Sequence, residues 1–595
     1  MNMLLRNITL DDLARMYDRH ADKSSTPFLT DPAALRRAKR LARKNWLWDD
    51  IASKLDPSTD IPVIKRSDYR NYQRVGDRTV PQKVDADRLE MLLLAAHAVW
   101  LKHPKADIDY LQDLLWAYCD NFTWVRAAHE DRSIDLGSAK LSTLFAEIIH
   151  ILGDQLEHEV TDRLRKEIDR RTFQNFWNPL DVLSWKTVRM NWNHVCNGCV
   201  IRTALHLVED PRLLAHLTHG AIINLTYALD GFSDDGGCEE GPGYWSFGFG
   251  HYLYVAHALY HRTGGELNLM EDPKVERICR YPLASNIAGR YRSTFADSGH
   301  GYIPSRVALT VNEFFDIPEL YELCPQHKDG SLQLEEEDHS LAHDFALYRN
   351  QKATGKTDNR DYILEDLGQV KIRSKPGKRQ MTVLTIAGHN GVPHNHNDVG
   401  SFIVYRNGKI HLVDPGGPKY RKETFGPRRY DIPYCSSYGH SIPVINGRLQ
   451  EKGSQHYGTF ETHNLNESDD KQIFIDMTHA YPKGTVKSLV RTLTLGFESN
   501  SLFLQDDYTF SRSPKSLEEA FVTFEKATVT RSGKSVQIGP KSNGLTIDCS
   551  VPGTFSVERL EEAAKTDGKN NEVITRIAFV PKKLSREMTL AFRIT

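Results

Sequence analysis

The sequence predicts a multidomain α+β protein, with a helical domain over residues 1–345 and an antiparallel β-sandwich over residues 346–595. Two observations predict this fold class. Apolar residues recur at helical spacing through the first part, and short β-rich runs separated by Gly, Asn, Asp and Pro fill the second. A chain of 595 residues also exceeds a single hydrophobic core, so two or three domains are expected.

Helical spacing is clearest in four stretches of the first part: residues 88–100, 141–156, 200–208 and 213–229. Helices that follow one another without intervening strands must bury their apolar faces against each other. The pattern therefore predicts packed helix pairs, arranged either as a solenoid or as a closed toroid. The charged stretch from Lys328 to Asp344 is the expected linker to the second domain.

The β-rich runs of the second part are residues 380–386, 402–413, 487–494, 501–510 and 555–560. Asn407-Gly408 is a strong signal for a type I′ hairpin, whose two central residues need positive φ. Residues 402–405 should therefore pair with residues 410–413. This pairing would return Asp414 to the sheet end at which the histidines of residues 394–396 lie.

Charge and hydropathy exclude two classes of protein. Lys and Arg number 76 against 78 Asp and Glu, a net charge of -2, which argues against a general nucleic-acid binder. No stretch approaches the ~20 apolar residues of a membrane-spanning helix, and the first residues lack the apolar core of a signal peptide. We expect a soluble protein in the cytoplasm, or a secreted or periplasmic one if an export signal has been removed.

The eight cysteines are too few and too scattered for a disulfide scaffold. Cys196 and Cys199 have the spacing of a CxxC pair, but no second CxxC completes a four-thiolate zinc site. We expect this pair to serve packing.

The segment His394-Asn395-His396-Asn397-Asp398 is the strongest candidate for chemistry, because it gathers two imidazoles and a carboxylate within five residues. These groups suit metal binding or proton transfer. His440 lies on a further arm that adds a third imidazole. The alternative is that these polar side chains satisfy backbone groups of loops.

Two segments of the helical part carry polar groups. Residues 191–198 interrupt the helical pattern with amides and an imidazole, and residues 235–245 form a glycine-rich turn that ends in Tyr244-Trp245. Glycines let a ligand approach the backbone, and an aromatic ring offers a flat face for a sugar. Asn193 could instead cap a helix, and Tyr244 could be an ordinary half-buried aromatic residue.

Together these segments resemble the heparinase II/III-like polysaccharide lyases, in which an (α/α) toroid precedes an antiparallel β-sandwich. The resemblance is strongest in residues 191–198, 235–245, 394–416 and 436–450, and it leaves the first ~180 residues weakly matched. It implies a catalytic set, a metal set for one mainly structural zinc ion, and a substrate-binding set. The catalytic set is Asn193, His194, Tyr244 and His394; the metal set is His396, Asp414 and His440; the substrate-binding set is Glu240, Trp245, Tyr420, Arg428, Arg429 and Tyr430.

The chemistry that this resemblance implies is β-elimination on a uronate-containing polysaccharide or oligosaccharide. Asn193 and His394 would neutralise the uronate carboxylate, and Tyr244 would protonate the leaving oxygen and could also take the C5 proton. Tyr420 or Tyr430 would be a second tyrosine of the site. Three alternatives are a uronyl C5-epimerase, a zinc-dependent hydrolase and a non-catalytic carbohydrate-binding protein.

Overall fold

The computed structural model describes residues 6–595 except residues 179–182, 335–340, 342, 357 and 570–571. The chain forms two compact units, each built from three segments. Unit 1 contains Met1–Gly231, Trp245–Glu276 and Ile303–Thr354, and unit 2 contains Phe232–Tyr244, Arg277–Tyr302 and Gly355–Thr595. Two segments of the helical half of the sequence thus belong to unit 2. The boundary at residue 345 stays a prediction, and part of the expected linker lies outside the described residues.

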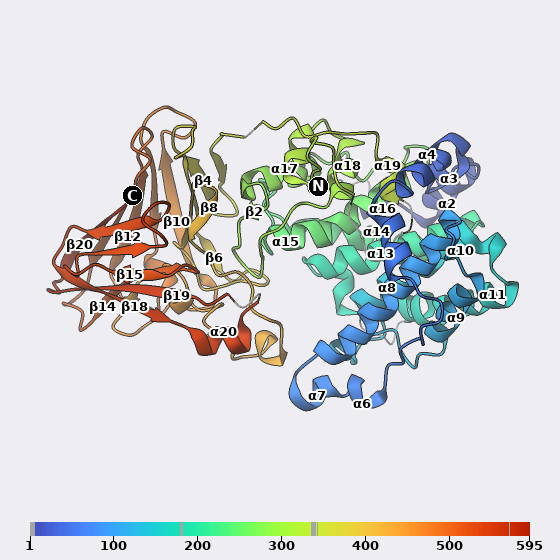
Figure 1. The fold of residues 1–595 in the computed structure, drawn as a ribbon, viewed down its shortest axis with the longest axis horizontal. Helices are drawn as coiled ribbons and strands as arrows, with labels where there is room; N and C mark the ends of the chain where they lie inside the picture. The colour runs from blue at the N-terminus through green and yellow to red at the C-terminus, as the bar shows by residue number, and fades with distance from the viewer. Residues whose placement is uncertain (1–5, 179–182, 335–340, 342, 357, 570–571) are drawn as a thin grey trace. The chain divides into compact units, whose positions relative to one another are not determined.

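Unit 1 is a packed set of helices (Figure 1). The described helices are α2 Leu10–Arg19, α3 Pro27–Thr30, α4 Pro32–Ala42, α5 Trp46–Lys54, α6 Arg66–Tyr69, α7 Asn71–Val75, α8 Thr79–Leu101, α9 Ile108–Cys119, α10 Leu136–Leu152, α11 His158–Ile168, α12 Gln174–Trp177, α13 Asn191–Leu207, α14 Pro211–Ala228, α16 Gly250–Arg262, α18 Ser305–Asn312 and α19 His343–Leu347. Helix α17, Pro273–Ser285, leads from unit 1 into unit 2. The four predicted helices correspond to α8, α10, α13 and α14 and are confirmed.

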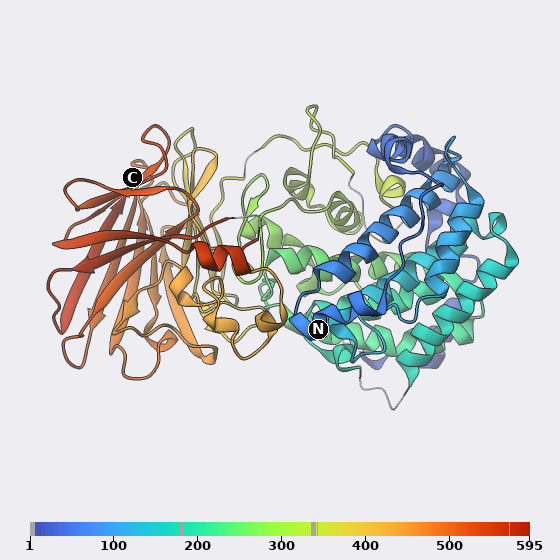
Figure 2. The ribbon, with the colours of Figure 1, turned by 60° about the horizontal axis from the view of Figure 1, so that its bottom comes forward.

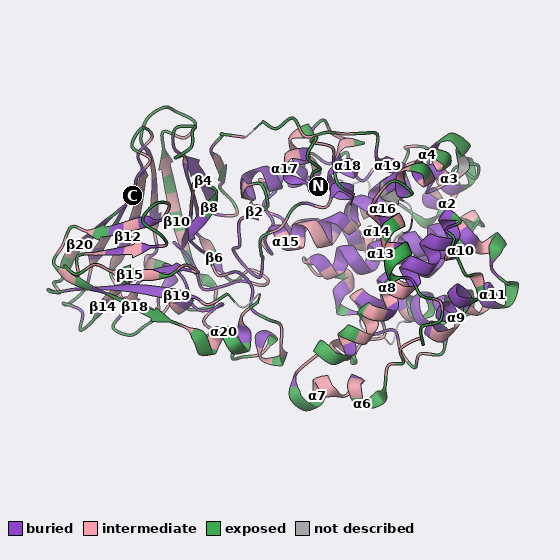
Figure 3. Cartoon of the chain, viewed as in Figure 1, coloured by how far each residue is buried: buried purple, intermediate pink, exposed green. Residues whose placement is uncertain are grey.

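The centre of unit 1 is α13, which packs against α10, α14 and α16 and is buried along nearly its whole length (Figure 3). The sequence predicted a break over residues 191–198, and this prediction is wrong because these residues form the first turns of α13. Their amides do not disturb the helix because neighbouring carbonyls accept their protons. Gly198 allows close approach to α16, since a Cβ there would lie 3.3 Å from the carbonyl oxygen of His251.

Unit 2 is built from antiparallel sheets (Figure 2). The described strands are β1 Asn286–Ala288, β2 Tyr291–Arg292, β3 Tyr362–Leu364, β4 Gln369–Arg373, β5 Met381–Ile386, β6 Gly388–Asn390, β7 Phe402–Arg406, β8 Lys409–Leu412, β9 Val444–Ile445, β10 Gly453–His463, β11 Lys471–Asp476, β12 Ser488–Leu495, β13 Leu502–Thr509, β14 Leu517–Thr523, β15 Ala527–Val529, β16 Ser535–Ile538, β17 Leu545–Cys549, β18 Gly553–Arg559, β19 Thr575–Pro581 and β20 Glu587–Ile594. Two short helices, α15 Pro242–Tyr244 and α20 Glu561–Asp567, also belong to it. The predicted strands at residues 380–386, 402–413, 487–494, 501–510 and 555–560 are confirmed.

Three large sheets give unit 2 its layers. The nine-stranded sheet has the order β15-β16-β17-β20-β13-β12-β11-β10-β6, and it is accompanied by the sheets β3-β4-β5-β7-β8 and β18-β19-β14-β9. Strands β11, β12 and β13 alternate buried and more exposed residues, as expected for strands with one face on a core. A single apolar cluster joins side chains from all three sheets, including Phe402, Leu493 and Phe579.

The hairpin at Asn407-Gly408 is confirmed. Both residues have positive φ, 53° and 80°, as a type I′ turn requires. Tyr405 pairs with Ile410, so β7 and β8 run antiparallel and return Asp414 toward the start of β7. Among the described residues, no helix combines the length and the apolar character needed to cross a membrane.

Candidate active site and metal centre

The loop between β6 and β7 carries both predicted histidines, His394 and His396, and directs their rings toward different partners. His394 has a left-handed backbone with φ of 59°, which is uncommon for a residue with a side chain and marks a constrained position. Hydrogen bonds hold the loop in this shape: the backbone N–H of Asn397 donates to the carbonyl of Cys435 at 2.9 Å, and Arg429 donates to the carbonyls of His394 and Asn395. The His394 ring then faces Tyr244, and the His396 ring faces His440.

Four buried residues could hold a metal ion: His396, Asp398, Asp414 and His440. Their ligand atoms all lie within 4.8 Å of one another. The structure thus brings together the three residues of the predicted metal set and adds Asp398, which lies in the same motif. Two imidazole nitrogens and two carboxylate oxygens form a donor set that suits a tetrahedral ion.

The hydrogen bonds of His396 and His440 support this assignment. In each ring one nitrogen, called inner here, faces the other histidine, and the outer nitrogen faces away from it. His440 Nδ1 lies 2.8 Å from the carbonyl oxygen of Ser436, which can only accept, so Nδ1 carries a proton. His396 Nε2 lies 3.2 Å from the Asp297 carboxylate and donates to it in the same way. In the neutral rings, the inner nitrogens therefore point lone pairs at each other across 3.3 Å. A cation between them removes this repulsion, and histidines oriented through their outer nitrogens are typical metal ligands.

The charges around these residues also favour a cation. Burial and the neighbouring Asp414 raise the pKa of Asp398 to about 7. Burial lowers the pKa of His440, but the Asp414 and Asp398 carboxylates and the Ser436 carbonyl together outweigh it, so the pKa is raised. A second group of possible ligands, Asp297, His396 and Cys435, is a poorer fit. Arg429 already supplies positive charge to Asp297 there, at 2.8 Å, and burial raises the pKa of the Cys435 thiol to about 12.

Beside the metal set lies a cluster of two tyrosines, one histidine and one aspartate, all in unit 2. The Tyr244 ring stacks on the His394 ring with centroids 4.3 Å apart, and its hydroxyl lies 2.5 Å from the hydroxyl of Tyr420. Tyr420 donates to Asp297 Oδ2 at 3.0 Å, and His394 Nδ1 lies 2.7 Å from the same oxygen. The structure thus brings Tyr244, Tyr420 and His394 together.

Asp297 connects this cluster to the metal set, and the sequence analysis did not identify it. Its Oδ2 faces His394 and Tyr420, and its Oδ1 faces His396 and Arg429. Burial raises the pKa of Asp297, but hydrogen bonds from His394 and His396 and the Arg429 charge outweigh it, so the pKa lies well below its usual range. Burial, followed by the charge of Asp297, raises the pKa of Tyr420 far above its usual value, so Tyr420 stays protonated.

Glycines place the Asp297 segment against the loop that follows Asp414. A Cβ at Gly417 would lie 2.7 Å from backbone atoms of Asp297, and one at Gly416 would lie 2.5 Å from the carbonyl oxygen of Ser298. Thr294 also donates to the carbonyl of Asp414 at 2.8 Å. A sequence signal for Asp297 existed in the run Ala-Asp-Ser-Gly at residues 296–299, but no spacing tied it to the histidines.

The other predicted substrate-binding residues of unit 2 differ in accessibility. Glu240 is buried, with a carboxylate oxygen 3.6 Å from His394 Nε2. Tyr430 donates to the side-chain oxygen of Asn395 at 2.5 Å, so of the two candidate tyrosines it is Tyr420 that reaches Tyr244. The Arg428 side chain is 73% exposed, whereas Arg429 is buried among the loop carbonyls.

Comparison with known proteins identifies the C-terminal part of the chain. Residues 359–591 match the family model described as Heparinase II/III-like, C-terminal. The chain has a heparinase II/III-like C-terminal domain. This domain contains the complete predicted metal set together with His394, Tyr420 and Arg429, whereas Tyr244 and Asp297 precede it. No curated protein matches the chain by sequence.

Solved structures extend the likeness beyond the heparinase II/III-like C-terminal domain. Heparan sulfate lyase HepC from Pedobacter heparinus is similar over 98% of this chain and 88% of its own, with a TM-score of 0.56 and 13% identity. A crystal structure of heparinase III is similar over 95% of this chain and 91% of its own, with a TM-score of 0.59 and 11% identity. These matches confirm the fold class, a helical toroid followed by an antiparallel β-sandwich.

The remaining predicted residues, Asn193, His194 and Trp245, belong to unit 1 and precede the heparinase II/III-like C-terminal domain in the sequence. Asn193 is fully buried, and its amide donates to the carbonyls of Lys186, Val188 and Asn224. His194 is buried between Phe249 and Tyr252, and burial lowers its pKa to about 3. Trp245 is also fully buried, so its ring faces protein and offers no open surface to a sugar. Cys196 and Cys199 are buried, and neither forms a disulfide bond within the described part of the chain.

Proposed function

We propose that the protein is a polysaccharide lyase that cleaves a uronate-containing chain by β-elimination, leaving a C4–C5 double bond. The observation that carries this proposal is the contact set of Tyr244, Tyr420, His394 and Asp297. Removal of the weakly acidic C5 proton needs a base, a cation or donor at the carboxylate, and an acid at the leaving oxygen. These four side chains supply all three functions in one place.

His394 is the proposed partner of the uronate carboxylate. Asp297 accepts from Nδ1 and fixes the ring orientation, so Nε2 is the nitrogen left to face a substrate. The Glu240 carboxylate, 3.6 Å from Nε2, already marks this side of the ring as a place where an anionic oxygen pairs. With Nδ1 held by Asp297, the Nε2–H of the ring would donate to the uronate carboxylate and stabilise the enolate that forms on it.

Tyr244 is the proposed acid. Because Tyr420 gives its only proton to Asp297, the short contact between the two hydroxyls requires Tyr244 to donate to Tyr420. In the presence of substrate, rotation of the Tyr244 hydroxyl redirects this proton to the leaving oxygen. Rotation of the Tyr420 hydroxyl toward Tyr244 would stabilise a Tyr244 phenolate, which is the form needed if Tyr244 also removes the C5 proton. Asn193 and His194 remain further candidates.

We further propose that the metal is one zinc ion with a mainly structural role. The bound ion would tie together the loops of His396, Asp414 and His440 and fix the outer nitrogen of His396 on Asp297. Asp398 supplies a fourth ligand, so a tetrahedral ion would have no open position for a water nucleophile. This argues against the zinc hydrolase.

The test is incubation with hyaluronan, chondroitin, dermatan, heparan sulfate, alginate and glucuronan in separate reactions. A lyase gives unsaturated products, which absorb in the ultraviolet. An epimerase run in heavy water instead incorporates deuterium at C5 without this absorbance, and a hydrolase gives new reducing ends without it. Absence of unsaturated product from every polymer by a zinc-loaded, folded enzyme would refute the lyase.

A further inference from the structure

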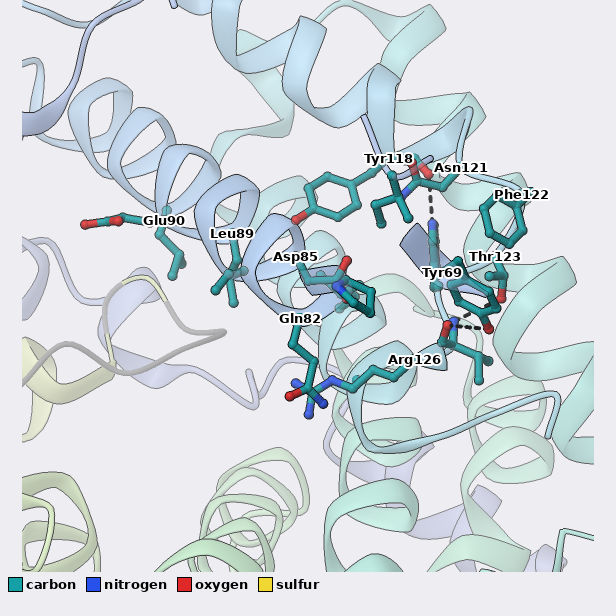
Figure 4. A pocket seen from close by; sticks show the side chains of 18 residues that line it. Tyr69, Gln82, Asp85, Leu89, Glu90, Tyr118, Asn121, Phe122, Thr123 and Arg126 are labelled. Atoms are coloured by element: carbon teal, nitrogen blue, oxygen red, sulfur yellow. Dashed lines mark hydrogen bonds between the residues drawn. The ribbon is translucent and has the colours of Figure 1, made fainter. Parts of the chain in front are cut away.

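A separate cavity of about 680 Å³ lies within unit 1. Helix α8 forms one wall, and the end of α9 with the loop at residues 121–126 forms the other (Figure 4). Gln82, Asp85 and Leu89 are on α8, and Tyr118 and Arg126 are directed toward it from the opposite wall. This volume is in the range of pockets that bind small organic ligands. The candidate active site described above uses none of these residues.

The polar side chains of the cavity have unused hydrogen-bonding capacity. Within the described part of the chain, the side chains of Gln82, Asp85 and Arg126 make no hydrogen bond and no ion pair. Arg88 lies behind the wall, 1% exposed, and its Nη1 donates to Asn121. Half-buried polar groups that face a cavity without protein partners are the groups that orient a ligand.

The apolar part of the lining is aromatic. Tyr69, Tyr118 and Trp124 are buried in the walls, whereas Phe122 stands at the rim, 55% exposed and packed edge-on against Tyr69 at 5.0 Å, and is the ring with an open face. An exposed aromatic ring beside half-buried polar groups matches a ligand that has an apolar face and a hydroxyl-bearing edge. Such a ligand is a sugar ring.

The charges of the cavity favour an uncharged sugar over an anionic one. Asp85 and Glu90 contribute carboxylates, while Arg126 lines the cavity and Arg88 lies behind it. Burial raises the pKa of Asp85 to about 6, although Arg126 and Arg88 oppose this. The cavity therefore has no excess of positive charge to hold a uronate or a sulfated sugar. A neutral ring can use amide, carboxyl and guanidinium groups together as hydrogen-bond partners.

We propose that this cavity is a binding site for an uncharged pyranose unit, such as an N-acetylhexosamine. Asp85 and Gln82 would hold ring hydroxyls, Arg126 would donate to a hydroxyl or carbonyl oxygen, and Phe122 would cover the apolar face. The proposal does not depend on the lyase reaction, because it concerns binding to unit 1 alone.

The probes are N-acetylglucosamine, its dimer and glucuronic acid, added to the full chain and followed by saturation-transfer NMR and calorimetry. Neutral sugars should bind saturably, the dimer at least as well as the monomer, and glucuronic acid should bind more weakly. Asp85→Ala should weaken binding by about tenfold to a hundredfold, because it removes a hydrogen bond to a charged acceptor. Phe122→Ala should also weaken binding.

Matched controls separate binding from folding. Asp87→Asn changes an acidic residue on the same helix that pairs with Lys83 outside the cavity, and Phe503→Ala removes a comparably exposed phenylalanine from unit 2. Both should bind like the parent, and circular dichroism should show that every variant is folded. No saturable binding of a neutral sugar, equal binding by Asp85→Ala, or preference for glucuronic acid would each overturn the proposal. The incubation with polymers tests the proposed lyase activity independently of this binding experiment.

Discussion

Replacing Asp297 by asparagine should damage both stability and turnover, because one carboxylate serves four donors. His394, Tyr420, His396 and Arg429 all contact its two oxygens. Asparagine keeps the shape but offers a single acceptor oxygen, so two of the four donors lose their partner whichever way the amide is turned. Each such charge-assisted bond is worth about 1.5–3 kcal/mol, so the loss of stability should be roughly 3–6 kcal/mol.

The expected loss of turnover has a different origin. His394 Nδ1 no longer meets an anionic acceptor, so the ring loses the interaction that fixes which nitrogen faces the substrate. Misplacing this group and the Tyr420 proton should lower kcat by about 10²–10⁴-fold. Turnover is measured below the melting transition of the variant, and the histidine ring nitrogens are followed by ¹⁵N NMR.

The matched control is Asp431→Asn, because Asp431 is an exposed carboxylate on the same loop as Arg429. It should leave melting, turnover and ring signals unchanged. If Asp297→Asn kept kcat within a factor of a few of the parent with unaltered His394 signals, the assignment of Asp297 as the orienting carboxylate would be wrong.

The remaining predictions concern three residues. Tyr244→Phe should lower kcat by about 10²–10⁴-fold with little change in melting temperature. The control Tyr457→Phe, at an exposed tyrosine of unit 2, should leave kcat unchanged. Near-normal turnover by Tyr244→Phe would show that Tyr244 is not the acid. His396→Ala should lose the zinc found by elemental analysis and melt at a lower temperature, because metal binding contributes to folding, and retention of stoichiometric zinc would contradict the ligand set. Asp85→Asn should stabilise the protein at pH 7 by at most ~3 kcal/mol, because burial raises the folded pKa of Asp85 from 3.8 to about 6 and solvent screening reduces the cost of the buried charge. This stabilisation should shrink as pH falls below 6. A difference in unfolding free energy between variant and parent that stays constant from pH 4 to pH 7 would refute the prediction.

Local sequence signals predicted much of unit 2 because its elements are set by neighbouring residues. Asn407-Gly408 fixes a turn within four residues, and the turn alone brings Asp414 back toward His396. Asp297 could not be found in this way. It reaches the histidines across about a hundred residues of sequence, through backbone packing at Gly416 and Gly417 that no periodicity records.

The helical half was harder to interpret at the level of single residues. The amides at residues 191–197 indicated a break, but in the structure carbonyls from outside the helix accept protons from Asn193, and α13 continues. Trp245 offered a flat ring for a sugar in the sequence, yet tertiary packing buries it. Burial of a single aromatic residue depends on contacts that one sequence does not reveal.

The interleaved path of the chain has a consequence for anyone who dissects or recombines this protein. A gene fragment that begins at residue 355 encodes every strand of the three large sheets and all four candidate metal ligands. It would still lack Tyr244 and Asp297, which are supplied by the two earlier segments of unit 2. A chimaera made by joining halves from two relatives would therefore combine the tyrosine and the aspartate of the contact set from one parent with its histidine and the candidate metal ligands from the other.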